Sequence, residues 1–283
     1  MRNFVPELAS GEWAGRTCSG YSTMSQFLSS LPLWLSTLLV IVLPTLVAMA
    51  GPVVIRRKFG LERLAANNEI AGFQFATVGV IYAVLIAFAT IVVWQRFNDA
   101  EAAVLQEAGA AVTIYRLAAG PEPEIAATRD ALNKYLKLVV DKDWRQMSVG
   151  EESEEANSAL NALYATATRI SKKGLLSGAI TEEIFDQLDS ITQARRVRLH
   201  LAAGIVPDIL WAVLFAGAML TIGFTFLFGA ESLSAQVVMT GILSVMVLMG
   251  LLVIVSVDHP FTGPVHVDTE PLDNALADFS RRS

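Results

Sequence analysis

The chain has few of the residues that build catalytic and metal sites. Among its 283 residues there is a single cysteine, Cys18, and there are three histidines. One cysteine excludes an internal disulfide and a cysteine-based metal site. The histidines, His200, His259 and His266, do not follow a metal-ligand spacing. Because we also find no nucleophile elbow, phosphate loop, dinucleotide fingerprint or zinc motif, we expect neither an enzyme nor a bound cofactor or metal.

Charged residues are also scarce, and there is no excess of basic ones. They make up 17% of the chain, whereas a soluble protein carries about 25%. The formal net charge is −6, and proteins that bind nucleic acid usually show a basic face. We therefore expect no nucleic-acid partner.

The shortage of charge is concentrated in four long apolar runs. The four runs are Leu33–Ile55, Gly72–Gln95, Ile209–Gly229 and Gln236–Val257. Each is close to the ~20 residues that a membrane helix requires. Buried helices of a large soluble protein are the alternative, but four such runs without a charge are rare there. No alternating strand pattern of useful length is present, so we predict an all-α membrane protein with four spans.

Four spans place both termini and the long segment between spans two and three on one side of the membrane. The tryptophans at the ends of spans one, two and three, Trp34, Trp94 and Trp211, then share that side, as expected for interfacial residues. Basic residues near the spans are nearly balanced between the two sides. We expect the long segment and both termini to be cytoplasmic, because large domains without a signal sequence most often stay inside.

The predicted spans divide the chain into five parts. These are a disordered tail over 1–30, spans one and two over 31–95, a helical cytoplasmic domain over 96–204, spans three and four over 205–258, and a tail over 259–283. Within the domain, span two should continue without a break over Trp94–Ala119. Further helices are expected over Glu124–Met147, over Glu151–Lys173, and from an N-cap at Thr181 toward Leu201.

Span two sorts its residues onto two different helix faces. A small-residue face contains Gly72, Ala76, Gly79, Ala83 and Ala87, followed by Thr90, and such faces allow close helix packing in lipid. A bulky face contains Ile81, Val84 (or Leu85) and Phe88, with Thr77 and Gln95 at its two ends. This bulky face could contact lipid, pack on a neighbouring helix, or form the apolar neck of a narrow pore.

No Asp, Glu, Lys, Arg or His lies inside the four predicted membrane cores. Proton-coupled transporters and rotary stators usually place a carboxylate or histidine there. This argues against a pump, and it is compatible with a passive channel or with a purely structural membrane protein.

A basic cluster, Arg195, Arg196 and Arg198, lies just before span three. It could attract anions toward a pore entrance or bind anionic lipid head groups. The plainer interpretation is a juxtamembrane cluster that fixes the orientation of the chain. Arg56, Arg57 and Lys58 at the other side allow the same interpretations.

Several runs together resemble the bestrophin-like domain family of bacterial and plant membrane proteins. They are GVIYAVLIAFATIVVWQRFNDAE at 79–101, EAGAAVTIYRL at 107–117, and the longer runs at 194–229 and 236–263. The resemblance covers roughly Leu33–Gly263. It implies the layout of bestrophins, which are pentameric anion channels with four spans per subunit. It also implies a hydrophobic neck on span two, cytoplasmic termini and, for this chain, a bacterial inner membrane location.

One departure concerns calcium. Calcium-regulated bestrophins carry a compact acidic run after span four, whereas Asp258, Asp268, Glu270 and Asp273 are spread out here. Because a calcium site needs six to eight converging oxygens, we do not predict calcium gating.

The leading hypothesis is a homo-oligomeric bestrophin-like ion channel, anion-conducting and pentameric by resemblance, whose partners are the lipid bilayer and inorganic ions. The alternative is a non-conducting scaffold or sensor whose long helical segment binds a partner. A third option, an ion-driven assembly similar to a stator, lacks the intramembrane carboxylate.

Overall fold

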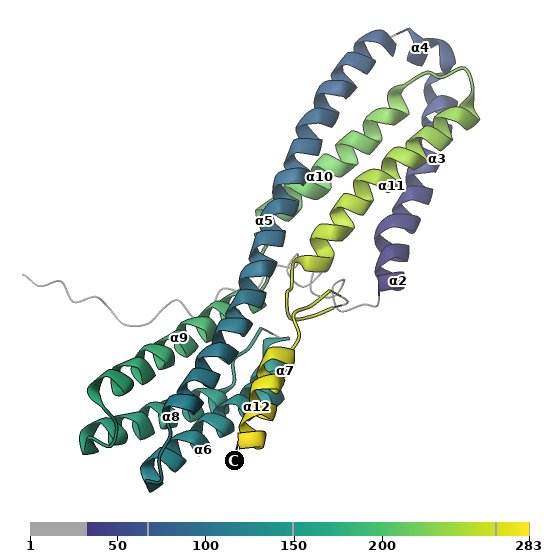
Figure 1. Ribbon diagram of the computed structural model, residues 1–283. Helices are drawn as coiled ribbons and strands as arrows, with labels where there is room; N and C mark the ends of the chain where they lie inside the picture. The colour runs from purple at the N-terminus through teal and green to yellow at the C-terminus, as the bar shows by residue number, and fades with distance from the viewer. Residues whose placement is uncertain (1–32, 67, 149, 264, 283) are drawn as a thin grey trace, which may run out of the picture.

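The computed structural model describes residues 33–66, 68–148, 150–263 and 265–282, and within these ranges it contains helices and no strand. Figure 1 shows an elongated molecule with one group of helices at each end and a single long helix that runs through both. The tail expected over 1–30 lies outside the described residues.

Four of the described helical segments are long and apolar enough to cross a membrane, which confirms the four-span prediction. The first span joins α2 (Leu33–Thr37), the π-helical segment η1 (Leu38–Val42) and α3 (Leu43–Phe59). The other three are α5 (Asn68–Leu117), α10 (Asp208–Phe224), which runs into the short η3 (Thr225–Leu227), and α11 (Leu233–Val257).

Two short connections at the far end of the bundle hold the spans together in pairs. The first, around α4 (Leu61–Ala65), links α3 to α5, and the second links α10 to α11. The Asn68 side chain donates to the Gly229 carbonyl and accepts from the Gly229 amide, both at 2.9 Å. The Arg56 Nη1 donates to the Ala230 carbonyl at 2.9 Å. A Cβ on Gly229 would lie 2.4 Å from the Ala65 backbone nitrogen, so this close approach requires glycine.

Helix α5 is the central element of the molecule. Its 50 residues make a rod of about 75 Å, which crosses the bundle and continues into the second group of helices (Figure 1). The helix passes residues 95 and 96 without a break, as predicted for Trp94–Ala119. The helix ends at Leu117, two residues before the end that was predicted at Ala119.

The remaining helices form an extramembrane domain around the second half of α5. They are α6 (Pro123–Leu138), η2 (Val139–Asp143), α7 (Trp144–Met147), α8 (Glu154–Lys173), α9 (Gly178–Ala202) and α12 (Glu270–Arg282). Helix α9 makes the most extensive contact with α5. One apolar core joins these elements, with fully buried Val104, Ala111 and Ile114 on α5 at its centre.

Three helices in this domain differ in detail from the sequence-based expectation. The predicted helix over Glu124–Met147 contains the π-helical segment η2. The helix predicted from Glu151 begins at Glu154, because the Ser153 hydroxyl accepts from the Ala156 amide and caps it. The N-cap predicted at Thr181 is instead Ser177, whose hydroxyl accepts from the Ile180 amide.

The segment 259–283, expected as a tail, ends in helix α12, which packs against α5. The Phe279 ring stacks on the Tyr115 ring with 4.1 Å between centroids, and the Tyr115 hydroxyl donates to the Phe279 carbonyl at 3.1 Å. Leu272, Ala275 and Phe279 are buried on one face of α12. This part of the chain therefore completes the core of the extramembrane domain.

Candidate functional site

Within the membrane, α5 packs against its own chain through one face. Tyr82, Ala89 and Val93 are buried there, and the Tyr82 hydroxyl donates to the Leu214 carbonyl of α10 at 2.9 Å. Gly217 on α10 makes room for the Tyr82 ring, since a Cβ at this position would lie 2.5 Å from it. This face fixes how the other two faces of α5 are presented.

The chain itself leaves the bulky face of α5 largely uncovered. Ile81 and Phe88 are each 65% exposed and Val84 is 48% exposed. Leu85 is half-buried against the membrane core of the chain, so Val84 fits an uncovered face better than Leu85 does. Thr77 and Gln95, at the two ends, are exposed, and the Thr77 hydroxyl donates to the Phe73 carbonyl at 3.1 Å.

The small-residue face of α5 is also open. Ala76, Ala83 and Ala87 are exposed, and a Cβ on Gly79 would meet no described atom within 4 Å. The nearest neighbour of a Cβ on Gly72 is the Phe228 ring, 4.0 Å away. At about 100° per residue, the bulky face, the small-residue face and the face packed on the chain lie roughly 120° apart. The single chain thus uses one of three faces of this helix.

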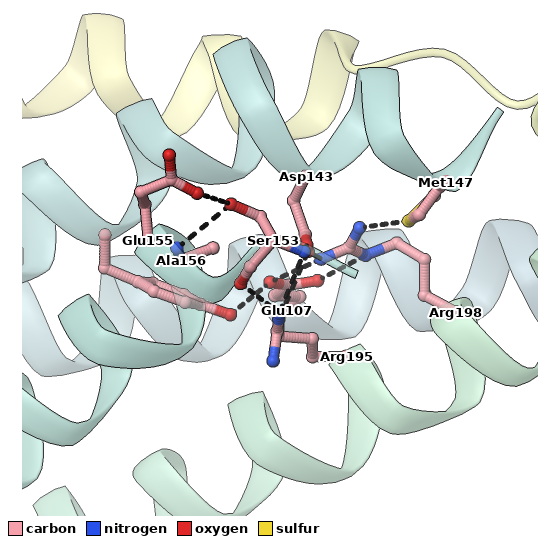
Figure 2. A network of polar contacts seen from close by, with 9 residues as sticks. Glu107, Asp143, Met147, Ser153, Glu155, Ala156, Arg195 and Arg198 are labelled. Atoms are coloured by element: carbon pink, nitrogen blue, oxygen red, sulfur yellow. Dashed lines mark hydrogen bonds and ion pairs between the residues drawn. The ribbon is translucent and has the colours of Figure 1, made fainter. Parts of the chain in front are cut away.

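Below the membrane, α5 enters a buried ionic cluster formed by Glu107, Asp143, Arg195 and Arg198 (Figure 2). The Arg198 Nε donates to Glu107 Oε2 at 2.9 Å, and its Nη2 donates to Asp143 Oδ2 at 3.0 Å. The Arg195 Nε and Nη2 both donate to Asp143, each at 3.1 Å. Two carboxylates and two guanidinium groups therefore balance each other inside the domain.

Neutral groups complete the hydrogen bonds of the ionic cluster. The Tyr135 hydroxyl donates to Glu107 Oε1 at 2.6 Å, and the Ser153 amide donates to Asp143 Oδ1 at 2.9 Å. The Arg198 guanidinium lies 5.4 Å from the centroid of the Trp144 ring. Because a buried charge is stable only when it is paired and hydrogen-bonded, this shell allows α5, η2 and α9 to meet through charged side chains.

The surroundings favour the charged forms of Asp143 and Arg198. Burial opposes the charge of Asp143, but the hydrogen bond from Arg195 and the charge of Arg198 outweigh it, so the pKa of Asp143 lies below its usual value. Burial likewise opposes the charge of Arg198, yet Glu107 and Asp143 raise the pKa of Arg198. Burial and the charge of Glu107 hold the pKa of Tyr135 well above its usual value.

The structure changes the interpretation of the basic residues before span three. Attraction of anions or lipid was one interpretation of Arg195 and Arg198, but these side chains are 5% and 0% exposed, and they pair with Glu107 and Asp143. They lie three positions apart on the face of α9 that packs into the domain. Arg196 points elsewhere and is exposed, so it alone of the three arginines remains available.

Glu107 and Asp143 were missed in the sequence. The feature that could have indicated Glu107 is its place within an apolar stripe formed by Ala103, Val104, Ala108 and Ala111. A carboxylate on such a stripe needs a buried cation. Asp143 has no comparable local pattern.

The segment after α11 joins the membrane bundle to the domain. Asp258 is buried, and its Oδ1 accepts from the amides of Ile205 and Val206 at 3.1 and 2.8 Å. Among the described residues, no group of three or more potential metal ligands gathers here or elsewhere. Asp258 therefore serves as an acceptor for the turn that leads into α10.

Comparison of the sequence with models of protein families shows the family to which the chain belongs. Residues 42–272, most of its length, match the model of the bestrophin-like domain. The chain belongs to the bestrophin-like domain family. No curated protein matches it.

Solved structures of bestrophin homologues share the fold of this bestrophin-like protein. A mutant form of a bacterial bestrophin homologue from Klebsiella pneumoniae superposes with a TM-score of 0.67 at 15% identity, covering 85% of this chain and 99% of the homologue. The structure of the homologue from zinc-based phasing gives a TM-score of 0.64 at 15% identity, covering 85% and 96%. The all-helical, four-span architecture is therefore that of a bestrophin homologue.

Proposed function

We propose that this bestrophin-like protein is a homo-oligomeric ion channel that conducts anions through a pore lined by α5. The observation that carries the proposal is the pair of open faces on α5, one bulky and one small, beside a third face that packs on the chain. A helix in a ring around an axis needs these three surfaces: one toward its own subunit, one toward a neighbour and one toward the pore.

The bulky face is the candidate neck. In a ring, Ile81, Val84 and Phe88 form successive apolar layers around the axis, and Thr77 and Gln95 supply polar groups at the two ends. A narrow apolar constriction gates by losing its water rather than by a plug. The four apolar runs of the spans contain no Asp, Glu, Lys, Arg or His, which suits passive conduction and gives a coupled transporter no intramembrane proton carrier.

The small-residue face is the candidate contact between subunits. Gly72, Ala76, Gly79, Ala83 and Ala87 let a second helix approach closely, which is how helices associate in lipid. The number of subunits, five, is taken from the relationship to bestrophins. The same relationship supports a bacterial inner membrane location with the extramembrane domain and both termini in the cytoplasm, and a function without enzymatic chemistry.

The alternative is a non-conducting scaffold or sensor. It is favoured by the uninterrupted course of α5, because a rigid helix shared by membrane and domain would transmit a binding event equally well without a pore.

Planar-bilayer conductance of the purified protein separates the two functions. The combined Ile81→Ala, Val84→Ala and Phe88→Ala variant should carry more current, because it widens and wets the constriction. The matched control is Ile209→Ala, Met219→Ala and Leu220→Ala on α10, whose side chains are also strongly exposed, and it should leave the current unchanged. Silence of all three proteins, with the oligomer intact, would favour the scaffold.

A further inference from the structure

A groove runs between α5 and α9 on the surface of the extramembrane domain. Its volume is about 540 Å³, and its polar lining consists of Arg96, Asp99, Gln106, Arg196 and His200. Alanine, valine and leucine side chains form the rest of its wall. This α5–α9 groove shares no residue with the buried ionic cluster.

One end of the α5–α9 groove lies where the membrane ends. The two helices are antiparallel (Figure 1), and the Gln106 Nε2 donates to the Ser190 Oγ at 2.9 Å, which sets their alignment. Arg96 lies ten residues before Gln106 on α5, and His200 lies ten residues after Ser190 on α9. Both are therefore about 15 Å from the Gln106–Ser190 pair in the same direction, so Arg96 lies level with His200. Arg96 follows Trp94, which is 52% exposed and occupies the interfacial position at the end of the span.

The groove carries more positive than negative charge. Arg96 approaches Asp99 with 3.6 Å between Nη1 and Oδ2, but both side chains are more than half exposed, so this pair holds Arg96 only weakly. Arg196 and His200 are exposed and lie one turn apart on α9. The result is one guanidinium group on each wall of the groove, with an imidazole at the membrane end.

Two guanidinium groups that face a common space match the oxygens of a phosphate group. Guanidinium donates two parallel hydrogen bonds to phosphate, and the imidazole of His200 adds a third donor. The surface of a membrane rich in anionic phospholipids supplies such groups at the level of Arg96. The apolar exposed Val197, beside Arg196 in the wall, offers a surface for the glycerol and the first methylenes of a lipid.

We propose that the α5–α9 groove binds a phosphate group between Arg96 and Arg196, with His200 as an additional donor. The phosphate can be that of an anionic phospholipid at the membrane surface or a phosphate free in solution. The site goes beyond ion conduction and does not depend on it, because its test reads binding rather than current.

Native mass spectrometry of the full-length protein in detergent tests the site. Phosphatidylglycerol is the anionic probe, phosphatidylcholine is the zwitterionic control, and inorganic phosphate is the soluble probe. Phosphatidylglycerol should bind more tightly than phosphatidylcholine, and Arg96→Gln and Arg196→Gln should each weaken it about tenfold, which is the scale of one charged hydrogen bond. The matched control is Arg169→Gln, which removes the same charge from an exposed position on α8 and should bind as the unaltered protein does.

The two phosphate sources give different results. Preference for phosphatidylglycerol that both groove variants lose assigns the site to lipid. Binding of inorganic phosphate that both variants lose, without a preference between the lipids, assigns it to a soluble phosphate. Should Arg96→Gln fail to fold, His200→Gln provides the second variant on the same groove. Unchanged binding of every probe in folded groove variants, or an equal loss in Arg169→Gln, would overturn the proposal.

Discussion

The ionic cluster should make the extramembrane domain unusually sensitive to the loss of Glu107. In the Glu107→Gln variant, Arg198 keeps Asp143 as a partner, but the two arginines then face a single carboxylate in the interior. Removing one partner from a buried ion pair costs about 3–5 kcal/mol. At roughly 3 °C for each kcal/mol in a domain of this size, Tm should fall on the order of 10 °C.

The matched control is Arg196→Gln on the same helix. Its side chain is exposed, and surface substitutions usually change stability by less than about 0.5 kcal/mol. Thermal unfolding followed by circular dichroism in detergent compares the variants. A Glu107→Gln protein that unfolds within about 2 °C of Arg196→Gln would refute the idea that the cluster stabilises the domain.

A second variant tests whether the unpaired charge explains the loss of stability in Glu107→Gln. The combined substitution of Glu107→Leu, Arg198→Met and Tyr135→Phe removes one carboxylate, one guanidinium and the hydroxyl that donates to Glu107. The remaining Asp143 and Arg195 still balance. Because apolar replacement of a complete buried pair is often neutral or stabilising, this variant should recover most of the Tm that Glu107→Gln loses. Failure to recover would mean that the hydrogen bonds of the cluster, not the unpaired charge, explain the loss.

Two further predictions concern pH and assembly. The pKa of Asp143 is lowered in the folded protein. The stability that its charge contributes is therefore present above the unfolded pKa of about 3.9 and is lost as pH falls through the folded pKa. Acid unfolding should be steeper in the unaltered protein than in Asp143→Asn. On the small-residue face, Gly79→Leu should dissociate the oligomer by blocking close helix approach, as measured by light scattering after gel filtration, whereas Gly223→Leu, where an added Cβ also meets no described atom within 4 Å, should not. An intact Gly79→Leu oligomer would remove this face from the subunit contact.

The membrane part of the fold could be predicted from the sequence because its determinants are local. Four runs without charge specify four helices whatever the tertiary contacts of the chain are. The continuous helical pattern through Trp94 predicted that α5 leaves the membrane without a break. The packing of α12 was harder to predict from the sequence. Its apolar residues, Leu272, Ala275 and Phe279, follow a helical spacing over only thirteen residues, and what they cover depends on Tyr115, far away in the chain.

The buried cluster shows the same limit for the candidate site. Arg195, Arg196 and Arg198 form one basic cluster in the sequence, and only their partners show which of them are buried. Glu107 is 91 positions from Arg198, so the pairing depends on how α5 and α9 meet. Helical spacing alone separates Arg196 from the other two, but it does not say which side of α9 is buried.

Thiol accessibility along α5 tests the central claim most directly. Cys18 is the single native cysteine, so a Cys18→Ser protein gives a background without thiols for Phe88→Cys, Gly79→Cys and, on α10, Met219→Cys. Bilayer current is recorded while a charged, water-soluble methanethiosulfonate reagent is added. A pore lined by the bulky face predicts that the current changes irreversibly for Phe88→Cys alone. Modification of Gly79→Cys with no effect at Phe88→Cys would contradict the account and assign the pore to the small-residue face.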